Sequence, residues 1–238
     1  MKTYQLLDIE NFTISTDDNY LISNKTKNIL VKSGVSTNLL TYNKIDSLDI
    51  NITIEKDATV NLYQVVQNMD NTNINETIYL NETGATFNTI VVLLGLKESV
   101  INSDIKVYHN TNHTNSDLKV YAVIKDEAKI NLDNNAYIKK NSYQSKAYQG
   151  AKGLSLSKKG RILVNPNLFI DEYDVMASHG VAMGSLNMDD LFYLMSRGLT
   201  KEEASQIVIM GFIEPILVAI DNEEITNIIR NNFKENLK

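Results

Sequence analysis

Apolar and polar residues alternate with a period of two through most of this chain, from about residue 10 to about residue 175. The alternation is clearest in the segments 52–54, 60–63, 78–80 and 130–132. Because successive side chains of a strand point to opposite faces, this pattern predicts strands with one buried face. Clusters of Asn, Asp, Gly, Ser and Lys lie between the segments and indicate turns. No helical stripe interrupts this part of the chain, so we predict a mainly β fold.

Four of these segments share one outline: a turn residue and a small residue, then an apolar residue followed by Asn. They begin at Asp57, Gly84, Glu98 and Glu127, separated by 27, 14 and 29 residues, roughly multiples of 14. A strand-and-turn unit that recurs at a fixed spacing is typical of a solenoid, in which each coil stacks on the last. The Asn side chains would either form a ladder or cap turns. Chance matches in an Asn-rich chain are the alternative.

The period changes to that of helices after about residue 185. Asn187 is a good N-cap, and Gly198 suits the left-handed position that ends a helix. Thr200 and Glu203 have the spacing of a capping box, which predicts the start of a second helix. Pro215 is expected to kink that helix or to mark a new start. These signals predict a small helical unit after the strands.

A last amphipathic helix is predicted near the end of the chain, capped by Asp221 or Asn222. Its apolar side would consist of Ile225, Ile228, Ile229 and Phe233. Exposed strand edges at the ends of a solenoid invite aggregation. We therefore expect the helices to cap one end of the solenoid and a second solenoid to cover another edge.

The composition is that of a soluble globular protein without thiol chemistry of its own. The formal net charge is -6, which argues against a nucleic-acid partner, since nucleic acids bind basic faces. Cysteine is absent, so the chain supplies neither a disulfide nor a thiolate ligand. The most apolar segment, 207–220, is too short to span a bilayer and contains Glu214 and Pro215. The first residues lack the apolar run of a signal peptide, so we expect a cytoplasmic protein without a membrane partner.

Three segments together form an extended motif. Residues 165–170 contain a "P-x-L-x-I"-like strand, 174–184 begin "D-V-x-x-S-H-G", and 191–198 read "L-F-Y-L-x-S-R-G". Ala204 and the pair Gly211 and Phe212 then match an "A … G-F" helix. In order and spacing these segments resemble the SufB/SufD family of iron–sulfur cluster assembly scaffolds, over about residues 105–215.

The resemblance implies a fold, a function and partners. The fold would be a right-handed parallel β-helix with two short strands per turn in residues 1–184, followed by an α-helical unit in 185–238. The function would be that of a non-catalytic scaffold. The chain would pair with a SufB-like chain or with itself through the C-terminal end of the β-helix, as a dimer, and would dock a SufC-type ABC ATPase on its helices. No Walker-type glycine loop is found in the sequence, which agrees with a partner subunit doing the ATP hydrolysis.

His179 is the candidate that the resemblance places at the subunit interface. A neutral imidazole binds iron well, and histidine replaces cysteine on some clusters, so His179 is a tentative metal ligand. Asp174 and Ser178 would support it, and a purely structural histidine is the alternative. Gly180 and the absence of cysteine make the chain SufD-like rather than SufB-like. The resemblance implies no stably bound cofactor, and a transient cluster would need sulfur ligands from a partner chain.

Weaker candidates surround this motif. His109 and His113 would point the same way on an extended strand, although two ligands without a third are a weak metal site. Asp171 and Glu172, together with Asp174, form an acidic patch that either offers oxygen ligands or is a solvated turn. We expect three further tyrosines to belong to the solenoid wall rather than to a nucleic-acid face: Tyr137, Tyr143 and Tyr148.

The helical unit is the expected ATPase dock because interface cores favour aromatic, Met and Arg side chains. The docking candidates are Phe192, Tyr193, Met195, Arg197, Phe212 and Ile216. Two alternatives stay open. The first is a degenerate paralogue that has lost its role in cluster assembly. The second is a β-solenoid binding module, although such modules usually carry a secretion signal and paired carboxylates.

Overall fold

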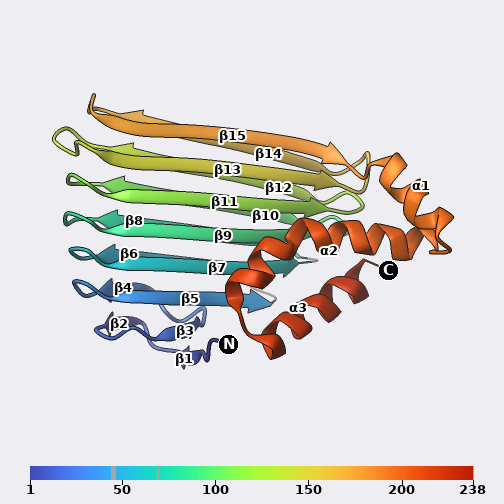
Figure 1. The fold of residues 1–238 in the computed structure, drawn as a ribbon, viewed down its shortest axis with the longest axis horizontal. Coiled ribbons are helices and arrows are strands. Elements are labelled where there is room, and N and C mark those ends of the chain that lie inside the picture. The colour runs from blue at the N-terminus through green and yellow to red at the C-terminus, as the bar shows by residue number, and fades with distance from the viewer. Residues whose placement is uncertain (44–46, 69, 238) are drawn as a thin grey trace.

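Fifteen strands and three helices make up the part of the chain that the computed structural model describes, residues 1–43, 47–68 and 70–237. The strands alternate between two sheets (Figure 1). The odd sheet consists of β1 (Gln5–Leu7), β3 (Asn19–Ile22), β5 (Ser36–Asn43), β7 (Thr59–Asn68), β9 (Thr86–Gly95), β11 (Asn115–Ile124), β13 (Ser145–Ser155) and β15 (Val175–Ser185). The even sheet consists of β2 (Asn11–Ile14), β4 (Asn28–Val31), β6 (Ser47–Ile54), β8 (Thr72–Leu80), β10 (Val100–His109), β12 (Lys129–Ile138) and β14 (Arg161–Ile170).

The two sheets are the two walls of one stack of coils. Each strand pairs in parallel with the strand two positions away in the chain, so every coil contributes one strand to each sheet. The repeats that begin at Asp57 and Gly84 stack in the odd sheet, and those at Glu98 and Glu127 stack in the even sheet. The 14-residue spacing is therefore half a coil. The predicted parallel β-helix with two strands per turn is confirmed.

Asparagine side chains form ladders along the outer faces of both sheets. In the odd sheet Asn38 donates to Asn19 at 2.6 Å, Asn61 to Asn38 at 3.2 Å and Asn88 to Asn61 at 3.0 Å. In the even sheet, Asn73, Asn102 and Asn131 form the same chain, with bonds of 2.9 and 2.8 Å. Each amide donates to the coil below and accepts from the coil above. Of the two roles predicted for these residues, the ladder is the one observed.

Apolar side chains fill the lumen between the two sheets. Alternate residues of each strand point inward, as Ile74 and Ile78 of β8 do, and most of them are fully buried. Burial of each Ile, Leu or Val side chain contributes about 1.5–3 kcal/mol, which is what holds the walls together. The same cluster extends without a break from Leu7 in the first coil to Ala151 near the last.

The coils widen along the chain. Paired residues are 15 positions apart where β1 meets β3, as in Gln5 and Tyr20, and 32 apart where β12 meets β14, as in Lys129 and Arg161. Strands of 3 or 4 residues in β1 to β4 give way to strands of 10 or 11 residues in β13 to β15. The solenoid is therefore tapered, with its narrow end at the N-terminus.

Three helices follow the last strand: α1 (Met188–Ser196), α2 (Lys201–Ile220) and α3 (Glu223–Asn236). Asn187 caps α1 by accepting from the backbone N–H of Asp189, and Thr200 opens α2 with a complete capping box. Asn222 caps α3, while Asp221 ends α2 in the left-handed conformation. The helix boundaries follow the predicted signals. The alternative that Pro215 starts a new helix is wrong, since α2 continues through it.

The helices lie along the side of the solenoid and do not cap its end, contrary to our expectation. Figure 1 shows α2 and α3 against the odd sheet, near the ends of its strands. The reason lies in the strands themselves: the outward side chains Tyr63, Val65 and Val92 are apolar and nearly or fully buried. They pack with Ile213 and Phe233 of the helices in a second apolar cluster. This side of the solenoid therefore has an apolar outer face that the helices cover.

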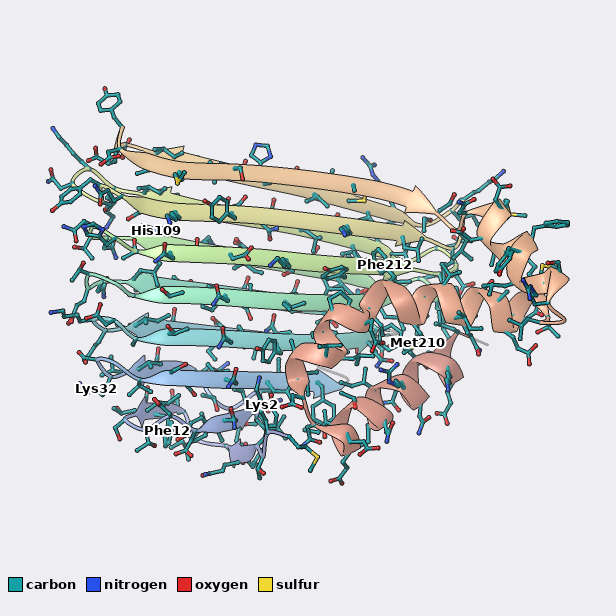
Figure 2. The ribbon with its side chains drawn as sticks, in the orientation of Figure 1. Lys2, Phe12, Lys32, His109, Met210 and Phe212 are labelled. Atoms are coloured by element: carbon teal, nitrogen blue, oxygen red, sulfur yellow. The ribbon has the colours of Figure 1, made fainter. Side chains whose placement is uncertain are left out.

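The N-terminal residues bind the corner between α2 and α3. The backbone N–H of Lys2 donates to the carbonyl of Asp221 at 2.7 Å, and the Tyr4 hydroxyl donates to the carbonyl of Ile220 at 3.0 Å. The Asn222 amide returns a bond to the carbonyl of Lys2 at 2.9 Å. Figure 2 labels Lys2 beside this corner. The first coil and the last helices are therefore joined directly.

Among the described residues, α2 is the helix that by length and composition would be able to cross a membrane. One side of it, including Ile209 and Ile216, is buried against the odd sheet and α3. A buried helix of a protein core passes the same test of length and composition. The packing of α2 against the odd sheet therefore explains its apolar composition.

Candidate functional site

His179 lies in β15, the last strand of the odd sheet, directly above Gln149 of β13. Inward and outward residues alternate along β13, and Gln149 is inward and 4% exposed. His179 therefore belongs to the inward set of its own strand. It is nevertheless exposed, because no described strand pairs with β15 on its other side. The histidine thus sits at the end of the lumen, where the solenoid opens to solvent.

The coil formed by β14 and β15, here called the open coil, exposes residues that would be core in any other coil. The equivalent positions of β12 and β13 are buried, yet Val181 is 45% exposed and Met183 is 47% exposed. Leu168 and Val175 are only partly buried against the coil below. Both strands also have one edge without a partner strand among the described residues. The open coil therefore combines an apolar surface with unpaired backbone groups, which is a surface suited to a second protein.

Ser178 and Asp174 do not join His179 in one site. Ser178 precedes His179 in the strand and so points to the outer face, where it stacks on Tyr148. Asp174 lies five residues before His179, which corresponds to about 16 Å along an extended strand. That separation is too large for both side chains to hold one metal ion.

The acidic patch near Asp174 is a turn. The Glu172 carboxylate accepts bonds from the backbone N–H groups of Tyr173 and Asn141, both at 2.9 Å. These bonds, the largest contribution coming from Tyr173, lower the pKa of Glu172. Glu172 thus holds the loop together, in agreement with the solvated-turn alternative.

His109 and His113 do not form a metal pair. His109 ends β10 inside the lumen, where its ring nitrogens lie 2.8 Å from Thr114 Oγ1 and 2.9 Å from Ser116 Oγ (Figure 2). Burial lowers its pKa to about 4. His113 lies in the following turn with a φ of 53° and packs edge-on against Tyr143 at 5.6 Å. The described residues contain no group of three or more His, Asp or Glu side chains arranged to hold a metal ion.

Tyr137 and Tyr148 belong to strands of the solenoid wall, whereas Tyr143 lies in the turn between β12 and β13. Tyr79, Tyr108 and Tyr137 stack on the outer face of the even sheet with ring centroids 5.4 and 4.6 Å apart, and Phe169 of the open coil continues the stack at 4.7 Å. Tyr143 and Tyr148 are 43% and 38% exposed. The role predicted for Tyr137 is therefore observed in its contacts.

Helix α1 presents four of the six residues expected to dock an ATPase. Phe192 is 74% exposed and Tyr193 is 58% exposed, with Met195 beside them. The Arg197 guanidinium lies over the Tyr193 ring at 5.2 Å and donates to its hydroxyl at 3.2 Å. A groove of about 970 Å³ separates α1 from the ends of β13 and β15, with Met183, Met188 and Leu191 among its lining residues. The exposed side chains of Phe192, Tyr193, Met195 and Arg197 are here called the α1 surface.

Phe212 and Ile216 pack against the solenoid. Ile216 is fully buried between α2 and the odd sheet. Phe212 packs edge-on against Tyr121 of β11 at 5.5 Å, where Figure 2 shows α2 crossing the strands. Both residues lie on the side of α2 that faces the solenoid. Both support the fold. The docking prediction is wrong for Ile216, which is fully buried, and it stays a prediction for Phe212, which is partly exposed.

A buried polar pair inside the lumen was not predicted from the sequence. Glu76 of β8 is 1% exposed and accepts a hydrogen bond from Gln64 of β7, also buried. Burial raises the pKa of Glu76 to about 7, and the bond from Gln64 opposes that shift. The signal was present: Glu76 occupies an inward position of the alternation, between Ile74 and Ile78.

The architecture defines the molecule as a parallel β-helix with an open last coil and a helical unit along one side. Residues 9–212 match the family described as SUF system FeS cluster assembly, SufBD core domain. The match covers most of the sequence, and the chain belongs to the SufB/SufD family. It begins well before residue 105, so the similarity includes the first hundred residues, where the sequence alone had shown only β character.

Individual relatives agree with the family. The chain is 28% identical to the iron-sulfur cluster assembly protein SufD of Bacillus subtilis over 218 residues, which are 88% of this chain and 49% of that protein. It is 23% identical to SufD of Escherichia coli over 149 residues, 63% of this chain and 35% of that protein. A SufBD family protein of Pyrococcus horikoshii is 39% identical over 87 residues, 36% of this chain and 19% of that protein. The chain thus spans about half the length, or less, of these relatives.

Proposed function

We propose that this chain is a non-catalytic scaffold subunit in iron–sulfur cluster assembly, acting in the cytoplasm. The observation that carries the proposal is the open coil, which places His179 at the centre of an apolar, unpaired end of the solenoid. Membership of the SufB/SufD family indicates that the process is iron–sulfur cluster assembly. The division of the chain into a β-helix, 1–184, and a helical unit, 185–238, is part of the proposal.

The proposed occupant of the open coil is a second β-helix of the same family, either a SufB-like chain or another copy of this one. A second open coil offers the same combination of apolar surface and unpaired strand edges, so that each covers the other. Since this chain contains no cysteine, the partner must supply the thiolates of any cluster at the contact. His179 would add one imidazole ligand, and the cluster would be transient.

The proposed ATPase site is the α1 surface. Exposed aromatic and Met side chains next to an Arg are what protein interfaces use as anchors. Contact with α1 would reach the open coil through the groove that the two share at Met183. This arrangement supports a route by which an ATPase bound at α1 acts on the contact between two solenoids.

Co-expression with the ATPase and a cysteine-bearing scaffold from the same organism tests the proposal. Val181→Asp should reduce recovery of the scaffold pair at least about tenfold, because a charge would be buried without a partner. Phe192→Asp should reduce recovery of the ATPase alone. Val218→Asp is the matched control, since Val218 is 68% exposed on α2 away from both surfaces, and both complexes should survive it.

His179→Ala distinguishes an active scaffold from the two alternatives. If the complex forms and its anaerobic cluster yield falls with this substitution, the active role is supported. A stable complex whose yield is indifferent to the change favours a degenerate paralogue. Free monomer under every condition favours a β-solenoid binding module and refutes the proposed function.

A further inference from the structure

Two buried amides in the coil below His179 have polar atoms without hydrogen-bond partners among the described residues. Asn134 of β12 is 1% exposed, and neither its Nδ2 nor its Oδ1 has such a partner. Gln149 of β13 donates through Nε2 to the carbonyl of Asn167 at 3.3 Å, but its Oε1 is unpartnered. An unsatisfied buried polar group costs about 1–3 kcal/mol. Proteins usually meet that cost with ordered water.

The two amides face each other across the lumen. Asn134 lies four residues before the end of β12, and Gln149 lies four residues after the start of β13, so both are equally far from the turn that joins the strands. The same count applied to β7 and β8 pairs Gln64 with Glu76, and those two side chains are hydrogen-bonded. The count thus identifies two inward residues that meet in that coil, and we infer the same arrangement for Asn134 and Gln149.

The open coil places His179 directly over this pair. His179 lies four residues after the start of β15, and Pro166 lies four residues before the end of β14, so these two also face each other. In the sheet registers His179 stacks on Gln149, and Pro166 stacks on Asn134. We name the space between these four residues the polar well.

The polar well is closed from below by apolar side chains. Ile105 stacks beneath Asn134 and Leu118 beneath Gln149, and both are fully buried. Neighbouring parallel strands are about 4.8 Å apart, and Gln149 Oε1 makes no direct hydrogen bond to His179, so one water molecule would bridge the imidazole and the amide. Water held beneath the imidazole would satisfy the unpaired amide atoms.

We propose that Asn134 and Gln149 are positioning residues for His179. They bind water beneath the ring, and this water forms a hydrogen bond with the ring nitrogen that faces the lumen. The bond made by one imidazole nitrogen decides which nitrogen carries the proton, so the ring is held in a single tautomer. Its other nitrogen then faces the open end of the solenoid. The inference rests on the proposed function only for the use of that outward nitrogen.

NMR of the isolated full chain, with ¹⁵N-labelled histidine, tests this at a pH where the imidazoles are neutral. The chain contains three histidines, and His179→Gln identifies the pair of signals that belongs to His179. We expect the two ring nitrogens of His179 to give widely separated shifts, one typical of a protonated nitrogen and one of a bare nitrogen. In Gln149→Met and Asn134→Leu, which keep the side-chain volume close to the original, these shifts should converge towards those of free histidine.

Gln64→Met is the matched control, because it removes the same amide from a lumen position several coils away from the polar well. It should leave the His179 shifts unchanged, whatever it does to stability. Rapidly averaged shifts for His179 in the unaltered chain would overturn the proposal, as would shifts that do not respond to either well variant. No partner is present in this measurement, so its failure is independent of whether the scaffold pair forms.

Discussion

Among individual residues, Glu76 makes the stability of the solenoid depend on pH. Its carboxyl group is enclosed by the lumen and keeps its proton up to a pKa of about 7, against 4.5 when the chain is unfolded. The unfolded state therefore loses this proton first as the pH rises. Stability is highest below pH 4.5 with respect to this group, and it falls until the folded form ionises near pH 7.

We expect Glu76→Gln to raise the free energy of unfolding at pH 8 by roughly 3 kcal/mol, because the neutral amide avoids the ionisation penalty. Urea unfolding of both proteins at pH 4 and pH 8 checks this, and the gain should vanish at the lower pH. Glu98→Gln, in an exposed turn, is the control and should change neither value appreciably. Equal effects of the two substitutions would show that Glu76 is not buried in solution.

The pH dependence of stability that His109 contributes has the opposite sign. Its pKa is lowered to about 4 by burial, below the ordinary 6.5, so the unfolded state takes up the proton first as the pH falls. The contribution of neutral His109 to stability is fully present above pH 6.5 and is lost as the pH falls towards 4. Proton NMR should show a His109 ring that does not titrate near pH 6.5. A midpoint at the ordinary value would contradict the enclosed position between Thr114 and Ser116.

At the scale of single elements, the asparagine ladders tie successive strands together outside the core. Asn102 makes two ladder bonds, to Asn73 and from Asn131, whereas Asn131 makes one. Because both sites are on the outer face, the lost bonds are the main difference between their alanine variants. Asn102→Ala should cost about 1 kcal/mol of unfolding free energy and Asn131→Ala about half as much. Equal losses in denaturant titrations would mean that the ladder bonds contribute nothing.

Helix α2 contains a glycine that its packing does not require. A Cβ added at Gly211 would meet no atom within 4 Å, and the backbone there is helical. Gly211→Ala should therefore stabilise the fold by about 0.5–1 kcal/mol, since alanine loses less conformational freedom on folding. A thermal unfolding scan measures the gain. The comparison is Gly198→Ala, which should be destabilising because Gly198 ends α1 with a φ of 97°.

Elements were predictable from the sequence where a local signal decides them. The strands followed from the two-residue period, and the helix ends from the caps at Asn187, Thr200 and Asn222. The faces of the helices were not predictable in this way. Phe212 and Phe192 look alike as exposed anchors in the sequence, but one packs on Tyr121 and the other stays free of the solenoid. That difference depends on which strands α2 meets, and no local pattern encodes it.

The same limit applies to the candidate site. The motif around His179 was recognisable from its residues, and its position at the end of the solenoid follows from being in the last strand. Gln149 and Asn134 were missed, because their meeting depends on the lengths of the turns between strands. Asp174 and His179 are only five residues apart in the sequence, so they were predicted to lie close together. The chain between them is mostly extended strand, which keeps the two side chains apart.

For the whole molecule, the contact between the N-terminal residues and the α2–α3 corner couples the narrow end of the solenoid to the helices. Tyr4→Phe removes the bond to the Ile220 carbonyl and keeps the ring. We expect faster hydrogen exchange of the backbone amides near residues 220–225, with exchange in β9 and β11 unchanged. Leu6→Ala, at an exposed site in β1, should leave both regions as they are. Uniform acceleration throughout the chain would instead indicate general destabilisation.

The taper of the coils has a consequence for how such molecules associate. The two ends of a stack of equal coils match each other in size. Copies can therefore add head to tail without limit and grow into a fibre. Here a strand of 11 residues at one end cannot be matched by a strand of 3 residues at the other. The proposed pairing would therefore join two broad ends and not a broad end to a narrow one. Unequal ends of the described solenoid thus disfavour head-to-tail growth of such copies into filaments.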